Sequence, residues 1–108
     1  MARYAILFTF KGETVKAMMD KPADRAAAAA EIVEAAGGTM ESYYLMFGAW
    51  DGICIATLPT SSAAAAVSLK VSSSGAFSHV ETHELLTADE LVGALRTADE
   101  LAYSPPGT

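Results

Sequence analysis

The sequence lacks several features that would mark a particular class of protein. Its single cysteine, Cys54, has no partner for a disulfide within the chain, so nothing indicates an oxidising compartment. No apolar run approaches the roughly 20 residues of a membrane-spanning helix, and the apolar run at 4–10 is too short for a signal peptide. Only 7 Lys and Arg stand against 13 Asp and Glu, which argues against a nucleic-acid or polybasic membrane partner. We therefore expect a cytoplasmic protein with no nucleic-acid or membrane partner.

Motifs that would name a reaction are also missing. The sequence contains no phosphate-binding loop, no dinucleotide fingerprint and no Cys-x-x-Cys pair. The serine run at 72–74 lacks the Gly-x-Ser-x-Gly context of a nucleophile elbow. We accordingly expect no cofactor.

What the sequence does have is an apolar fraction of 52% in 108 residues, which suits one domain with a real core. Much of that fraction is alanine, concentrated at Ala26–Ala30 and Ala63–Ala66, where small side chains let a helix lie close to a sheet. We expect one domain over residues 1–103, followed by a frayed tail at 104–108.

Apolar patterning and turn residues predict the order of the elements. The predicted strands are 4–10, 40–47, 53–58 and 77–86, and the predicted helices are 24–36, 63–73 and one that begins at a capping box formed by Thr87 and Glu90, with a brief helical turn at 14–19. Pro22 is expected at the first position of the helix before Gly37. The resulting β-α-β-β-α-β order with a C-terminal helix predicts an α+β, ferredoxin-like fold. Its four-stranded antiparallel sheet would carry both main helices on one face.

The central strands are apolar on both faces. Ile6 and Phe8 lie on one face of the 4–10 strand, and Ala5 and Leu7 lie on the other. Helices on one side leave the second face of such a sheet bare. We therefore expect that face to meet a second copy of the chain, sheet against sheet, in a homodimer or larger assembly.

The residues around the predicted hairpin resemble the GYD-domain family. They are, in order, Gly38, Ser42-x-Tyr44-Leu45, Gly48-x-Trp50-Asp51 and Pro59. The resemblance extends from Tyr4 to about residue 101. Trp50 stands where the family's Gly-x-Tyr-Asp motif has tyrosine, so an indole N–H replaces a phenol hydroxyl. The resemblance implies a small bacterial or archaeal protein of the dimeric α/β-barrel type, with no assigned general activity.

One predicted strand carries the most reactive side chains. His79, Glu81 and His83 share a face of the 77–86 strand, with Phe77 and Leu85 expected on the same side. The two histidines are four residues apart, so their Cα atoms lie about 13 Å apart along a strand. That distance is too great for both to bind one ion, and we predict no metal site. A polar strand face or interface is the simpler interpretation, and an acid–base role in a cavity is the functional one.

Residues near the predicted turn are further candidates. Trp50 and Asp51 either close a tight turn and plug a core or interface, or lie at the rim of a ligand cavity. Tyr43 and Tyr44 are expected on opposite faces of their strand, with Glu41 on the side of Tyr43. Cys54 lies in an apolar strand and is predicted to be a buried, inert thiol.

Three functions fit these patterns. The first is a cytoplasmic homo-oligomer that binds a small, largely apolar ligand, between sheet and helices or at the dimer seam, through Tyr44, Trp50, Asp51, His79 and His83. The second is a cofactor-independent enzyme in which one of these histidines, beside Glu81, moves a proton. The third is a structural or accessory oligomer without a ligand.

Overall fold

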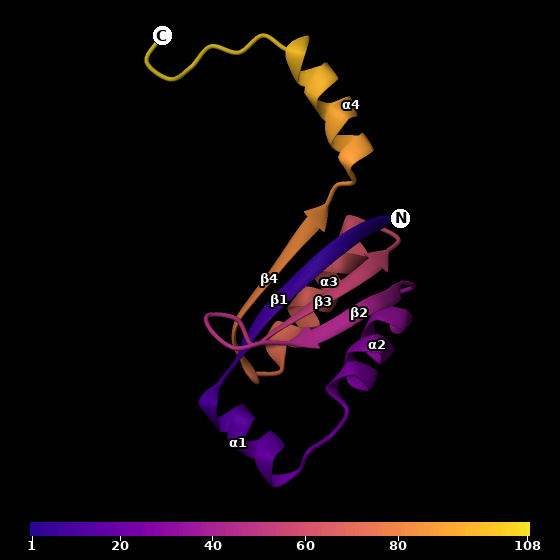
Figure 1. The fold of residues 1–108 in the computed structure, drawn as a ribbon, viewed down its shortest axis with the longest axis vertical. Coiled ribbons are helices and arrows are strands. Elements are labelled where there is room, and N and C mark those ends of the chain that lie inside the picture. Colours follow the sequence, from indigo (N-terminus) through magenta and orange to yellow (C-terminus); the bar gives the residue numbers. More distant parts are fainter.

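The chain folds around one antiparallel sheet in a computed structural model that describes all 108 residues (Figure 1). The strands are β1 (Ala2–Phe10), β2 (Thr39–Leu45), β3 (Gly52–Leu58) and β4 (Phe77–Leu85), and the helices are α1 (Gly12–Asp20), α2 (Arg25–Ala35), α3 (Ser61–Ser73) and α4 (Ala88–Asp99). The strand order is β2-β3-β1-β4, and every neighbouring pair is antiparallel. The predicted β-α-β-β-α-β order and four-stranded sheet are confirmed.

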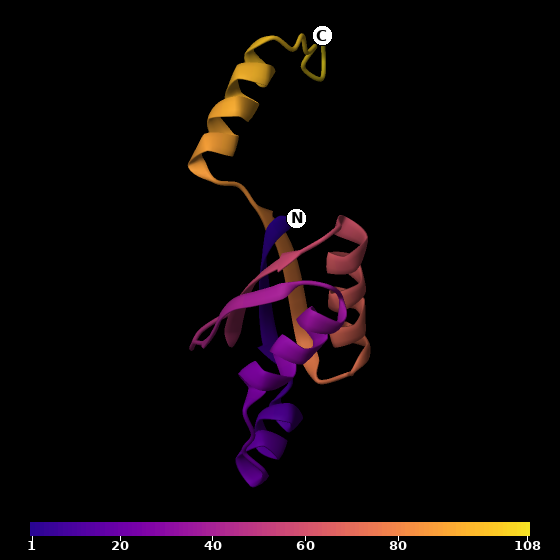
Figure 2. The same ribbon diagram turned by 90° about the vertical axis from the view of Figure 1, so that its right-hand side faces the viewer.

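Helices α2 and α3 both lie on one side of the sheet, as Figure 2 shows. The core lies between them and the two central strands, and consists of Tyr4, Ile6, Val33, Cys54, Ala56, Leu58, Ala64 and Val67. Ala64 is buried, so the backbone of α3 lies close to the sheet there, as the alanine content predicts. We call the side of the sheet that α2 and α3 cover the helix-covered face, and the opposite side the open face.

Side-chain caps fix where the helices begin. The Asp24 carboxylate accepts a hydrogen bond from the Ala27 amide at 3.1 Å, and the Thr60 hydroxyl accepts one from Ala63 at 3.1 Å. Asp24 thus starts α2, and the prediction that Pro22 occupies its first position is wrong. Other ends differ as well. Helix α1 is a full helix from Gly12, and β2 ends at Leu45, before the fully exposed Phe47. Strand β1 and helix α3 each begin two residues earlier than predicted.

Two β-bulges change which side chains share a face. Between β1 and β4, Thr9 pairs with His79 but Phe10 pairs with Phe77, so Ser78 is the extra residue. The ring of Phe77 therefore lies on the helix-covered face, with its centroid 5.3 Å from that of Phe10. The prediction that Phe77 shares the face of His79 is wrong, because the extra residue of the bulge interrupts the alternation of side chains between the two faces.

The second bulge has the same effect on β2. Met40 pairs with Ala56 and Ser42 pairs with Ile55, which makes Glu41 the extra residue. The Glu41 carboxylate forms an ion pair with Arg3 at 2.9 Å. Along β1 the core residues Tyr4 and Ile6 point to the helix-covered face, so Arg3 points to the open face. Its partner Glu41 therefore lies on the open face too. The prediction that Glu41 accompanies Tyr43 is therefore wrong.

Helix α4 extends away from the sheet (Figure 1). Its predicted capping box is confirmed: the Thr87 amide donates to the Glu90 carboxylate at 3.0 Å, and the Glu90 amide donates to the Thr87 hydroxyl at 3.1 Å. All residues from 86 to 108 are exposed, and the radius of gyration is 17.3 Å, against about 13 Å for a compact domain of this length. None of the four helices combines the length and the apolar composition that a membrane-spanning helix needs.

Candidate functional site

The open face has apolar side chains at its centre and polar ones along both edges. The centre consists of Ala5, Leu7, Ile53 and Ile55, from the two middle strands, and all four are buried or half-buried. The β4 edge carries His79, Glu81 and His83, and the β2 edge carries Glu41, Ser42 and Tyr44. A sheet side with an apolar centre and a polar rim has the composition of a surface that another molecule covers.

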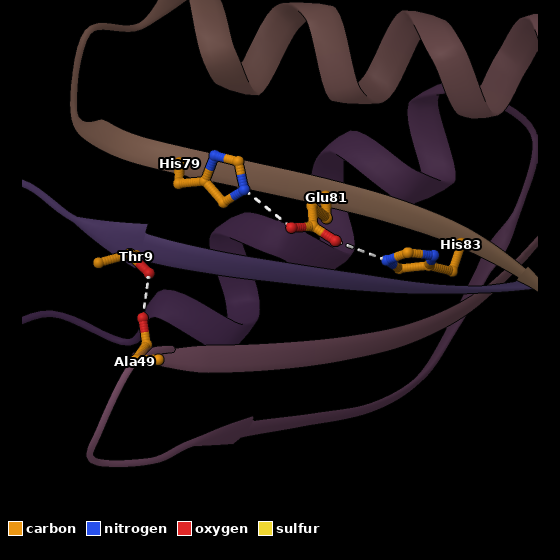
Figure 3. A network of polar contacts seen from close by, with 5 residues as sticks. All are labelled: Thr9, Ala49, His79, Glu81 and His83. Atoms are coloured by element: carbon orange, nitrogen blue, oxygen red, sulfur yellow. Dashed lines mark hydrogen bonds and ion pairs between the residues drawn. The ribbon is translucent and has the colours of Figure 1, made fainter.

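The carboxylate of Glu81 lies between the two histidines (Figure 3). One carboxylate oxygen is 2.8 Å from Nε2 of His79, and the other is 2.8 Å from Nε2 of His83. Alternate residues of a strand project from the same face roughly 7 Å apart, so a Glu between two His can reach both rings. The three side chains that the sequence predicts on one face are therefore brought together, joined through the Glu81 carboxylate.

This arrangement sets the electrostatics of the cluster. Hydrogen bonds from His79 and then His83 lower the pKa of the Glu81 carboxyl, and this effect outweighs the opposing effect of desolvation. Both histidines use Nε2, so when Nε2–H donates to Glu81 the free lone pair is on Nδ1. A carboxylate that fixes the tautomer of an imidazole in this way gives the ring an oriented proton acceptor. In that tautomer each ring presents an oriented Nδ1 acceptor, which is the geometry that a general base requires.

Trp50 lies beside this cluster. Its indole stacks on the His79 ring, with centroids 5.2 Å apart and an interplanar angle of 30°. The Thr9 hydroxyl donates to the carbonyl of Ala49 at 2.8 Å, which holds the loop before β3 against β1 (Figure 3). The structure thus places Trp50 at one end of the open face, next to His79.

Asp51 points in another direction, toward the backbone of β1. Its carboxylate accepts a hydrogen bond from the Phe10 amide at 2.9 Å, and its own amide donates to the carbonyl of Phe8 at 2.8 Å. At the next residue, Gly52, a Cβ would lie 2.3 Å from the Phe8 ring. These two residues fasten the start of β3 to β1, and the Asp51 carboxylate is occupied by that contact.

Tyr44 is not brought near the histidines. It pairs with Ile53 on the β2 edge of the open face and is 69% exposed. Three strand spacings, about 14 Å, separate that edge from β4. No group of three or more His, Cys, Asp or Glu side chains is placed to hold a metal ion.

A separate cavity of about 290 Å³ lies between the helix-covered face and helices α2 and α3. Eleven of its 14 lining residues are hydrophobic, and none of the five ligand-binding residues predicted from the sequence is among the 14. The other three lining residues are Arg25, Lys70 and Ser74, and two of the hydrophobic residues, Tyr43 and Cys54, add a hydroxyl and a thiol. The signal that could have located it is the alanine run: Ala28 and Ala29 line the cavity and leave space above Ile6 and Phe8.

Two ionisable groups in this cavity are held neutral. Cys54 is 4% exposed, as predicted for a buried thiol, and burial raises its pKa to about 11. Desolvation likewise raises the pKa of the Tyr43 hydroxyl, although the nearby charge of Arg25 opposes the shift. At neutral pH the cavity interior therefore offers a thiol and a phenol, both hydrogen-bonding groups without charge.

The sheet order and the two helices on one face define a ferredoxin-like α+β domain. The sequence matches the GYD domain over residues 4–95, so the chain belongs to the GYD-domain family. A comparison with curated protein sequences finds no significant match.

Solved structures that resemble the chain include the following two. The crystal structure of At3g17210 from Arabidopsis thaliana aligns with a TM-score of 0.52 and 11% identity, over 82% of this chain and 96% of that one. MupZ from Pseudomonas fluorescens aligns with a TM-score of 0.42 and 15% identity, over 99% of this chain and 97% of that one. The likeness to the Arabidopsis protein supports the fold and goes no further.

Proposed function

We propose that this GYD-domain protein is a cytoplasmic homo-oligomer that binds a small, largely apolar molecule in the cavity between the sheet and helices α2 and α3. The cavity carries the proposal, because its apolar lining and few polar groups are typical of small-molecule sites. Its volume of about 290 Å³ suits a molecule of about ten non-hydrogen atoms, at about 30 Å³ for each water-sized group.

The open face supports the self-association in this proposal. Leu7, Ile53 and Ile55 form an apolar centre that no helix of the same chain covers, and burial of such a centre favours association. A second copy packed sheet against sheet would cover it and place the cluster of Glu81 and the two histidines in the seam.

Calorimetric titration with n-octanamide, a neutral amphipathic molecule of about ten non-hydrogen atoms, tests the binding. Ala29 lines the cavity and Ala27, two residues away on α2, is exposed outside it. We expect Ala29→Leu to weaken binding at least tenfold by filling the space, and Ala27→Leu to leave it unchanged. Equal affinities in the two variants would show that the molecule binds elsewhere, and absence of binding to the unmodified protein would contradict the proposed function.

A cofactor-independent enzyme is the second candidate function, and the Glu81 cluster is the observation that favours it. Proton transfer by His79 or His83 requires a neutral ring with a fixed tautomer, and the carboxylate between the rings supplies the means of fixing it. Nitrogen NMR of the rings at neutral pH is expected to show the Nε2–H tautomer at both histidines, and a mixture of tautomers in Glu81→Gln. Identical spectra for the two proteins would remove the support for this candidate.

A further inference from the structure

The cavity of the proposed function has two cations in its lining. Arg25 is the first residue of α2, and Lys70 lies in the last turn of α3. The two residues are 45 positions apart along the chain, so only the packing of the two helices brings the two charges to one cavity. Both side chains are exposed, as expected for groups at the opening of an apolar space.

Neither cation forms an ion pair within the chain. The ion pairs of the structure are Arg3 with Glu41 and the two histidines with Glu81, and they involve neither Arg25 nor Lys70. No Asp or Glu lines the cavity, although the chain carries 13 acidic residues against 7 basic ones. The nearest carboxylate in sequence, that of Asp24, accepts the Ala27 amide as the cap of α2, and its charge also acts at the Tyr43 hydroxyl without its side chain lining the cavity. Two of the seven basic residues thus share one cavity that has no acidic lining.

Most of the rest of the lining is apolar. Ile6 and Phe8 from β1, Val67 from α3 and Phe77 from β4 are among its residues. The phenol of Tyr43 lies close enough to Arg25 for the two groups to interact electrostatically. The cavity therefore joins an apolar interior to positive charge and to a neutral hydrogen-bonding hydroxyl.

We propose that the molecule bound in this cavity is an amphipathic organic anion: an apolar chain or ring of about ten atoms that ends in a carboxylate held by Arg25 and Lys70. This inference rests on the proposed function and specifies the class of its ligand. An apolar tail gains from burial against the strands and helices. The carboxylate stays at the opening, where the guanidinium forks onto its two oxygens with two hydrogen bonds and the ammonium adds a further charge-assisted one.

Paired titrations with octanoate and n-octanamide test the charge, because the two molecules match in length and differ in the charge of the head group. We expect the unmodified protein to bind octanoate at least tenfold more tightly than octanamide. Raising the salt concentration should narrow this difference, because salt screens charges at an exposed opening. Equal affinities for the two molecules would overturn the inference while leaving the proposed function intact. If neither molecule binds, both the inference and the proposed function are overturned.

Variants test the assignment of the two cations. In Arg25→Gln/Lys70→Gln we expect the preference for octanoate to disappear while the affinity for octanamide stays the same. The double variant Lys16→Gln/Arg96→Gln is the matched control, since it removes the same formal charge from α1 and α4, outside the cavity. Retention of the preference in Arg25→Gln/Lys70→Gln, or its loss in the control, would overturn the assignment. Retained octanamide binding shows that the fold and cavity are intact.

Discussion

The helix-covered face and the open face of the sheet are built from the same strands but differ in what they carry. On β3, Cys54, Ala56 and Leu58 point toward the helices and are at most 4% exposed, whereas Ile53 and Ile55 on the other face are half-buried. The cavity with its two cations lies on the first side, and the cluster of Glu81 with the two histidines lies on the second. Alternation along a strand thus separates the proposed binding site from the proposed interface by one sheet thickness. Substitutions can therefore address each side alone.

The largest loss of stability is expected when a buried side chain on the helix-covered face is truncated. Leu58 is 0% exposed, so Leu58→Ala should lower the free energy of unfolding by about 2–5 kcal/mol. Ile55→Ala, on the open face of the same strand, should lower the free energy of unfolding clearly less at low protein concentration. It should instead weaken self-association. Urea unfolding at several protein concentrations measures both. If both variants lose the same stability at every concentration, the two faces do not differ in the way described.

The second-largest effect is expected on self-association, when a charge is placed on the open face. Leu7 pairs with Ile53 on one side and with Glu81 on the other, at the centre of the open face. In the monomer, the lysine of Leu7→Lys would be exposed to solvent beside the Glu81 carboxylate. In a sheet-to-sheet dimer, the same lysine would put a charge into the seam. We expect its dimer to be weakened at least about 100-fold, which is roughly 2.7 kcal/mol, as measured by sedimentation equilibrium. Leu69→Lys on the exposed side of α3 is the control and should leave association unchanged. A monomeric unmodified protein at micromolar concentration would refute the proposed assembly.

The smallest effect should appear on the acid limb of stability. The lowered pKa of Glu81 means that the folded protein binds fewer protons at this carboxyl than the unfolded chain, whose value is near 4.5. Its contribution to stability is therefore present above that value and is lost as the pH falls through the lowered one. Urea midpoints between about pH 6 and about pH 3 should fall less for Glu81→Gln than for the unmodified protein. Glu31, in the middle of α2, is exposed and makes no side-chain hydrogen bond or ion pair, so Glu31→Gln should reproduce the unmodified curve.

Local signals allowed the sequence to predict the order of the elements and the topology of the sheet. Thr60 caps α3 and Thr87 pairs with Glu90 through contacts only three residues apart, which a sequence displays directly. The faces of Glu41 and Phe77 could not be predicted, because each depends on a one-residue bulge set by the neighbouring strand. The same limit applies to the cavity. Arg25 and Lys70 belong to one site only after two helices have packed on the sheet.

The stacking of Trp50 on His79 gives the molecule an optical property of its own. The chain contains one tryptophan, and its indole ring contacts an imidazole that is also hydrogen-bonded to Glu81. Indole emission responds to the charge and polarity of its surroundings. The fluorescence of the unlabelled protein therefore reports on the end of the open face where the loop before β3 meets β4. A change in the charge of that cluster, or its coverage by a second copy, would occur next to the indole and change its emission. A molecule bound in the cavity would lie on the other side of the sheet, away from the indole.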